Sequence, residues 1–226
     1  MSKYKMKAKI FIIVLSAAAF LPAPLVTKVR AESTGANENQ IKVAFLYNFI
    51  KFVDWPEDKV VDSNDTIVIG VIGEDPFGEA LNFIEGKQVG DKKVAVKRFE
   101  GLDELKKSGE KDKAELNSKI ETLRKCHMLF ICSSEKKNTE EIINLVKDHN
   151  ILTVGDMKDF LKASGIINFL IEDKKVRFEI NAVAAEQAEI KIRSKLLRLA
   201  KRVVDKDDIG REILNPETNF SLICKR

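Results

Sequence analysis

The chain has 226 residues, of which 44% are hydrophobic and 33% are charged, and it contains 11 glycines and 5 prolines. These fractions are typical of one globular domain and exclude collagen-like, low-complexity and intrinsically disordered chains. The formal net charge is +4, but residues 1–31 hold six basic residues and no acidic residue. The remaining chain has 33 basic and 35 acidic residues, a charge of about −2, which excludes the basic excess of most nucleic-acid-binding proteins.

The amino-terminal segment has the pattern of a secretory signal peptide. Lysines precede the apolar run Ile10 to Leu25, and Val29-Arg30-Ala31 then places small residues at the cleavage positions. We expect cleavage near Ala31, so that residues 1–31 are a signal peptide, residues 32–40 are a polar spacer and the mature protein is exported. A retained membrane anchor is the alternative. It is disfavoured because a serine and two prolines interrupt a run that is short for about 30 Å of hydrocarbon.

The mature chain alternates between strand and helix patterns. Runs of β-branched residues predict strands, and apolar residues at intervals of three and four predict helices. In chain order we expect a helix over 41–55, a strand over 67–72, a helix over 76–85, a strand over 94–99, a loop and a solvated helix within 106–125, a strand over 128–132, a helix over 139–149, a strand over 151–154, a short helix ending at Leu161, two strands over 166–171 and 176–180, and a long basic-faced helix over 182–204.

This order predicts an α/β fold. Repeated strand–helix–strand units favour a mostly parallel sheet of about six strands with helices on its faces. The last two strands are separated by only four residues, so we expect an antiparallel hairpin there. Residues 41–204 then form one domain, and residues 205–226 form a carboxyl-terminal tail.

The chain has three cysteines, Cys126, Cys132 and Cys224. The first two flank a predicted strand, which would separate their Cα atoms by about 20 Å. Because a disulfide needs Cα atoms within about 7 Å, we expect these two to be buried free thiols. Cys224 could be free, paired across chains, or paired with one of the others.

Several patterns that could indicate catalysis have simpler structural explanations. The segment Gly73 to Gly78 spaces its glycines as a phosphate-binding loop does, but it lacks the following Gly-Lys-Ser/Thr, and Glu74 and Asp75 would repel phosphate. Histidines number only two, which is too few for most metal sites. Cys132 follows a strand, where a nucleophile could lie, but no Gly-x-Ser-x-Gly motif surrounds it. We therefore predict no catalytic residues, no metal and no cofactor.

Ligand binding is better supported at the carboxyl ends of the predicted parallel strands, where open α/β sheets have their crevice. The residues at these strand ends are Gly73, Glu74, Ser133, Ser134, Gly155 and Asp156. The simpler interpretation is that Asp75, Ser134 and Asp156 only cap helices. In the last strand Arg177, Glu179 and Asn181 alternate with apolar residues and share one face. That face is either only solvated, or it holds an anion through the planar guanidinium of Arg177.

The first helix carries a second stripe next to its apolar one. Tyr47, Lys51 and Trp55 recur at intervals of four and share one side. Such an amphipathic stripe could contact a partner protein.

At these residues the sequence resembles the YfiR family of exported regulators. The resemblance covers nearly the whole mature domain, and its specificity comes from the order and combination of the matching stretches. These are residues 42–49 with Phe52 and Trp55-Pro56, residues 152–156, residues 165–169, residues 176–181 and residues 191–197.

The resemblance implies a periplasmic, non-catalytic protein with a three-layer α/β/α domain that is often dimeric. Similar members repress an inner-membrane diguanylate cyclase by binding its periplasmic part, which lowers cyclic-di-GMP signalling and biofilm formation; others are fused to histidine kinases. The best-studied repressors of the family rely on disulfides, whereas this chain has too few suitably placed cysteines.

We therefore expect a periplasmic sensor or repressor of a membrane signalling protein. The expected ligand-binding residues are Arg177, Glu179, Asn168, Gly155 and Asp156, and the expected partner-binding residues are Tyr47, Lys51 and Trp55. Two alternatives stay open: a solute-binding module for a small anion or metabolite, and an enzyme that uses Cys132.

Overall fold

The computed structural model describes residues 29–56 and 65–206. Most of the expected signal peptide, the tail from residue 207 onward and Cys224 lie outside the described residues. No helix within the described ranges is long and apolar enough to span a membrane.

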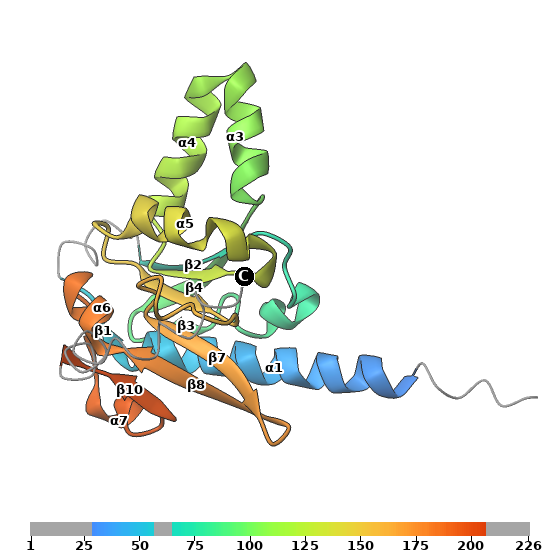
Figure 1. The fold of residues 1–226 in the computed structure, drawn as a ribbon, viewed down its shortest axis with the longest axis vertical. Coiled ribbons are helices and arrows are strands. Elements are labelled where there is room, and N and C mark those ends of the chain that lie inside the picture. Colours follow the sequence, from blue (N-terminus) through green and yellow to red (C-terminus); the bar gives the residue numbers. More distant parts are fainter. Residues whose placement is uncertain (1–28, 57–64, 207–226) are drawn as a thin grey trace, which may run out of the picture.

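A central sheet organises the described part of the chain, in the order β10-β8-β7-β6-β5-β2-β4-β3 (Figure 1). Its five middle strands run parallel, and β7 and β8 form the predicted antiparallel hairpin. This confirms the α/β fold with a mostly parallel sheet. The strands are β2 (Thr66–Ile72), β3 (Gln88–Val89), β4 (Lys92–Phe99), β5 (Met128–Ile131), β6 (Leu152–Gly155), β7 (Ile167–Glu172), β8 (Lys175–Asn181) and β10 (Arg202–Val204).

Helices cover both faces of the sheet, which makes three layers (Figure 1). The helix α1 (Val29–Lys51) packs on one face, where Phe49 lies with its ring centroid 5.0 Å from that of Phe178 and 5.5 Å from that of Phe169. The helices α3 (Leu102–Lys111), α4 (Lys113–Arg124) and α5 (Thr139–Val146) belong to the other side. Because β5 and β6 are buried along their whole length between these layers, their residues are apolar apart from Thr153 instead of alternating.

The first helix differs from its expected bounds at both ends. It starts at Val29, so residues 32–40 are helical, and it ends at Lys51 instead of Trp55. Val53–Asp54 then form a short strand, β1, that pairs with β9 (Lys191–Ile192). The helix ends early because the Phe52 carbonyl accepts a hydrogen bond from Arg193 N, a partner far along the chain.

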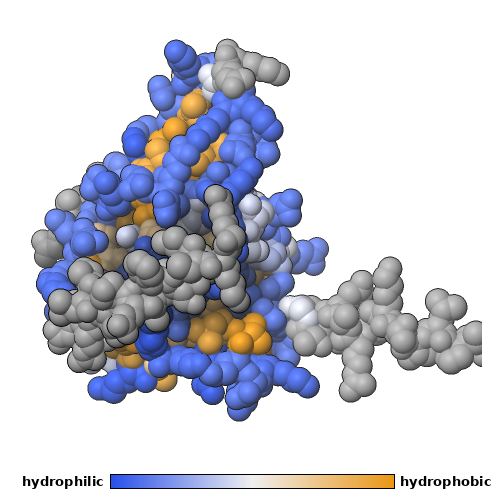
Figure 2. Space-filling model, viewed as in Figure 1, coloured by the Kyte–Doolittle hydropathy of each residue, from blue (hydrophilic) through white to orange (hydrophobic). Residues whose placement is uncertain are grey.

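The charged segment 106–125, expected as a loop and a helix, is part of two helices. The first, α3, begins at Leu102, and Asp112 then caps α4 by accepting hydrogen bonds from Ala114 N and Glu115 N. The two helices form a hairpin that projects from the sheet (Figure 1). In Figure 2 hydrophilic side chains cover this hairpin, and apolar ones are visible only in the seam between its helices.

The long helix expected over 182–204 is wrong. Instead α6 (Ala182–Gln187) ends where Glu189 takes a positive φ of 56°, and β9, α7 (Ser194–Leu197) and β10 follow. The chain reverses because Ile190 and Leu196 are buried against the core next to α1, and a straight helix would not place both there.

Other helices are shorter than expected. The short helix ending at Leu161 is absent, and turns replace it. Residues 76–85 contain only the 3-10 helix η1 (Gly78–Phe83), and α5 is preceded by a second 3-10 helix, η2 (Ser133–Asn138). Cys126 and Cys132 are both buried, as expected.

Candidate functional site

The carboxyl ends of the parallel strands form one edge of the sheet, where open α/β sheets bind ligands. Here β2 lies between β4, the next parallel strand along the chain, and β5. The connection after β2 leads to β4 on one side and the connection after β5 leads to β6 on the other, so a crevice is expected between the ends of β2 and β5. The residues that follow these strands, Gly73 to Asp75 and Cys132 to Glu135, define the candidate site.

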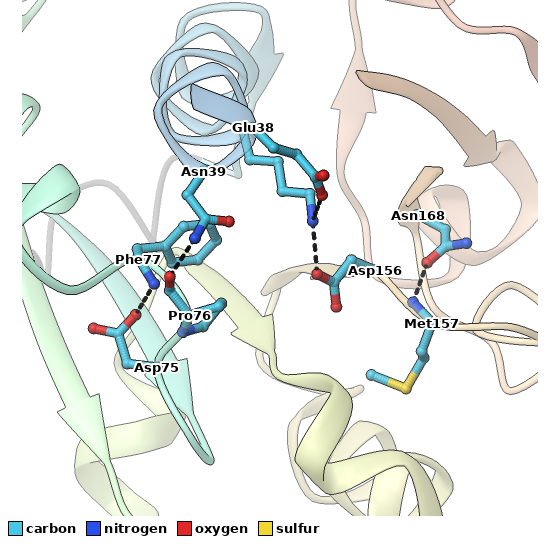
Figure 3. Close-up of polar contacts among 9 residues, drawn as sticks. Glu38, Asn39, Asp75, Pro76, Phe77, Asp156, Met157 and Asn168 are labelled. Atoms are coloured by element: carbon cyan, nitrogen blue, oxygen red, sulfur yellow. Dashed lines mark hydrogen bonds and ion pairs between the residues drawn. The ribbon is translucent and has the colours of Figure 1, made fainter. Parts of the chain in front are cut away.

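Next to this edge, α1 is anchored by a buried lysine (Figure 3). The Lys42 side chain is only 7% exposed, and its Nζ lies 2.9 Å from Asp156 Oδ2 and 2.8 Å from Glu38 Oε1. Burial acts to lower the pKa of Lys42, but the hydrogen bonds and charges of both carboxylates outweigh it and hold the pKa above its usual 10.5. Asp156 Oδ1 is buried without a hydrogen-bond partner in the described part of the chain.

Asp75 does not cap a helix, as the simpler interpretation expected, because η1 begins at Gly78 and its cap residue, Phe77, makes no side-chain cap hydrogen bond. Asp75 closes a turn after β2 instead. Its Oδ1 accepts a hydrogen bond from Phe77 N at 2.7 Å, and its Oδ2 accepts one from Arg98 Nε at 2.8 Å. Asn39 of α1 donates to the carbonyl of Pro76, so α1 touches this loop as well (Figure 3). The loop after β2 is thus held by a neighbouring strand and by α1.

Glu135 is a residue of this edge that the sequence analysis did not single out. It is 6% exposed, and its Oε2 accepts hydrogen bonds from Leu102 N and Asn138 Nδ2, both at 3.1 Å. Glu135 therefore caps α3 from another loop, where the positive end of the helix favours a carboxylate. The Ser134 hydroxyl accepts a hydrogen bond from Glu74 N at 2.9 Å, which ties the loop after β5 to the loop after β2.

Cys132 is not suited to nucleophilic chemistry. Burial raises the pKa of its thiol to about 12, and four carboxylates act in the same direction: Asp75, Asp156, Glu135 and Glu74. The thiolate is the nucleophilic form, so at neutral pH this cysteine is inert. The alternative of an enzyme that uses Cys132 is therefore disfavoured.

The expected ligand-binding residues do not converge on one point. Gly155, Asn168 and Glu179 lie side by side across β6, β7 and β8. The side chain of Asn168 accepts a hydrogen bond from Met157 N at 3.1 Å (Figure 3), and Glu179 forms an ion pair with Arg202. The register places this row on the face of the sheet away from α1, because the neighbouring Phe169 and Phe178 pack on α1.

Asp156 and Arg177 are separated from that row in different ways. Asp156 is turned toward Lys42 on α1. Arg177 is exposed opposite Leu170, farther along the hairpin, and makes no ion pair within the described residues. The residues that follow β2 and β5, in contrast, are brought together by direct contacts.

The expected partner-binding residues are also divided. Lys51 Nζ lies 5.3 Å from the centroid of the Tyr47 ring on α1, whereas Trp55 lies beyond the helix and donates from Nε1 to the carbonyl of His127 at 3.1 Å. The structure adds Phe83, which is 65% exposed, and Lys87, whose Nζ lies 3.4 Å from the Phe83 ring centroid and 5.5 Å from that of Tyr47. Tyr47, Lys51, Phe83 and Lys87 thus form a contiguous aromatic and basic surface, called here the aromatic–lysine surface.

Comparisons with known proteins identify one family. The sequence model of the family described as YfiR/HmsC-like matches residues 39–201. No curated protein matches the chain.

Two solved structures resemble the chain at low sequence identity. A conserved domain protein from Vibrio cholerae O1 biovar El Tor strain N16961 is 13% identical with a TM-score of 0.49, and the ABC domain in complex with L-Trp from Streptococcus pneumonia is 10% identical with a TM-score of 0.48. Each match covers 74% of this chain and 60% of the other, so the chain spans less than two thirds of either structure.

Proposed function

Because this chain belongs to the YfiR/HmsC-like family of periplasmic regulators, we propose that it binds the periplasmic part of a membrane signalling protein of the diguanylate cyclase type and represses it. Such binding would lower cyclic-di-GMP signalling and biofilm formation. The observation that carries the proposal is the extent of the family match, which runs from the middle of α1 to the residue before β10 and so covers the whole sheet apart from that edge strand.

The aromatic–lysine surface is the best-supported place for the partner. Aromatic and cationic side chains that are exposed together are typical of protein interfaces. Lys51 and Lys87 form no ion pair within the described ranges and are therefore available to carboxylates of a partner. Trp55 is left out of this surface, because its indole is engaged with His127.

The proposal can be tested with the full-length protein in its native host. Deletion of the gene should raise cellular cyclic-di-GMP, and a photo-crosslinking residue in place of Lys51 should capture a membrane protein that mass spectrometry identifies by its cyclase domain. The same crosslinker in place of the exposed Lys107 on α3 is the matched control. An unchanged cyclic-di-GMP level together with no captured membrane signalling protein would refute the proposed function.

The alternative of a periplasmic solute-binding module draws on a different observation, which is the crevice at the carboxyl edge of the sheet. Solute binding and repression are compatible, since a regulator can take a small ligand as its input. The chemistry of that crevice decides which ligand it could accept.

A further inference from the structure

The chemistry of the aromatic–lysine surface restricts what kind of partner segment can bind there. At 65%, Phe83 is the most exposed large hydrophobic residue in the described ranges. It belongs to η1, which packs beside α1, and Lys87 links its ring to that of Tyr47 on the helix. An aromatic ring left in water forgoes the stabilisation of burial, so a partner that covers Phe83 gains that free energy.

Two ammonium groups flank these rings. Lys87 Nζ lies 3.4 Å from the ring centroid of Phe83, and Lys51 Nζ lies 5.3 Å from that of Tyr47. Neither lysine forms an ion pair in the part of the chain that the structure describes. An ammonium group has three N–H donors, so it can contact a ring and still pair with a carboxylate of a partner.

A third lysine adds positive charge at the same end of α1. Lys195 of α7 places its Nζ 4.9 Å from the ring centroid of Phe52, the residue after Lys51. All cation–ring contacts within the described ranges therefore lie on the carboxyl half of α1 or beside it. The nearby Asp54 is already paired with Arg193. This end of the helix thus presents cations whose charge a partner can still neutralise.

The neighbouring edge of the sheet offers little backbone for pairing. The strand β3 has only two residues, and the carbonyl of Gln88 in this strand accepts a hydrogen bond of 2.9 Å from the Tyr47 hydroxyl. A partner strand that used this carbonyl would have to displace Tyr47. Recognition here therefore depends on side chains, with an exposed ring and an ammonium group on each side of Tyr47.

We propose that the membrane partner presents an acidic segment to this surface, with two carboxylates that pair with Lys51 and Lys87 and a large apolar side chain that packs on Phe83. This assignment rests on the proposed function and adds the chemistry of the partner to it. Both ammonium groups lie within 5.5 Å of the Tyr47 ring centroid, so they are separated by no more than twice that distance. One or two turns of a helix, or alternate positions of a strand, span such a gap.

An anionic lipid surface fits these observations less well. Surfaces that bind membranes insert several apolar side chains beneath a larger group of basic residues. Here one large ring is strongly exposed, and Tyr47 is half-buried. A single apolar anchor between charges is the usual arrangement of a protein interface, in which a central ring contributes most of the affinity and the charges around it speed association.

Charge reversal in the full-length protein in its native host tests the assignment. Lys51→Glu combined with Lys87→Glu should weaken affinity capture of the cyclase-type partner at least about tenfold and raise cyclic-di-GMP toward the level of the gene deletion. Lys51→Arg combined with Lys87→Arg keeps both charges and should stay within about twofold of the wild type. The matched control, Lys107→Glu with Lys113→Glu, reverses two exposed charges on the hairpin of α3 and α4 and should leave capture unchanged.

Two further measurements separate the ring from the charges. Phe83→Ala should weaken capture without altering its salt dependence, because the charges remain, whereas capture by the charge-reversed variant should lose most of its salt dependence. Selection for restored repression in the charge-reversed strain should yield changes from Asp or Glu to Lys or Arg in the periplasmic part of the partner.

Several results would overturn the assignment. Capture and cyclic-di-GMP at wild-type levels in the charge-reversed variant would place the partner elsewhere and leave the proposed function intact. An equal loss in the Lys107→Glu, Lys113→Glu control would show general attraction between charges. Unchanged capture, together with loss of sedimentation on phosphatidylglycerol vesicles, would assign the surface to lipid. If the wild type captures no cyclase-type protein, the proposed function fails and this assignment fails with it.

Discussion

The middle and the carboxyl end of α1 carry similar side chains in different surroundings. In the middle, near the carboxyl edge of the sheet, Lys42 is buried between two carboxylates, and its side chain is 7% exposed. At the end of the helix Lys51 is exposed beside the Tyr47 ring, and the nearby pair of Arg193 and Asp54 is also largely exposed. The comparison teaches that helical spacing reveals which residues share a face, whereas burial determines how much each contact contributes to stability.

The largest effect should follow from breaking the buried pair. Asp156→Asn leaves the Lys42 ammonium with only Glu38 as a charged partner, and we expect the free energy of unfolding to fall by about 2–3 kcal/mol. Urea denaturation measures this. The matched control is Asp159→Asn in the same loop, an exposed partner of Lys162 whose loss should cost less than about 0.5 kcal/mol. Equal effects in both variants would mean that Lys42 is not a buried anchor.

Alkaline pH should weaken the same contact. The pKa of Lys42 lies above 10.5 in the folded protein, so the contribution of its charge is complete below about pH 10.5 and is lost as the pH rises through the folded value. The difference in unfolding free energy between the wild type and Lys42→Met should therefore shrink above that pH. A difference that stays constant across the alkaline range would contradict a stabilising role for the charge of Lys42.

A smaller effect is expected where α1 gives way to β1. Trp55→Phe removes the hydrogen bond to the His127 carbonyl and should lower the unfolding free energy by about 1–2 kcal/mol. Tyr47→Phe, which removes the exposed bond from Tyr47 to the Gln88 carbonyl, should cost less than about 0.5 kcal/mol and serves as the comparison. If the two substitutions lower the unfolding free energy equally, the greater burial of the Trp55 hydrogen bond does not make it the stronger contribution.

The smallest effect belongs to the exposed pair at this end. The hydrogen bond from Arg193 outweighs the opposing effect of burial and holds the pKa of Asp54 below its usual 3.8. The contribution of this pair to stability is therefore present above about pH 4 and is lost as the pH falls through the lower folded value. Asp54→Asn should cost at most about 1 kcal/mol at neutral pH. The difference between the denaturation curves of wild type and variant should shrink as the pH falls below about 4; a difference that stays constant would rule out this pair as its source.

The sheet could be predicted from sequence because its signals are local. The strands β5 and β6 are short, mostly apolar runs, and the hairpin of β7 and β8 is marked by the turn at Asp173 and Lys174, where both residues adopt positive φ. Such local patterns predict the strands correctly, because a strand that is buried on both faces consists mainly of apolar residues.

Residues 182–204 could not be predicted in the same way. Their basic residues recur at nearly helical spacing, but the chain is reversed by contacts with distant residues, such as Arg193 with Asp54 and Arg202 with Glu179. The candidate site was only partly predictable for the same reason. The residues that follow the strands were identified, but Lys42 and Glu135 act on partners 114 and 33 residues away, and no pattern along the chain marks them.

The two outermost strands of the sheet have a consequence for solubility. β3 has two residues and β10 has three, fewer than the seven residues of β2 in the interior of the sheet. An exposed strand edge offers unpaired backbone groups to other chains, and short edges next to lysine and arginine discourage such pairing. Lys87, Lys92 and Arg202 flank or occupy these strands. The outermost strands therefore discourage edge-to-edge aggregation, which favours side-chain surfaces as the means of association.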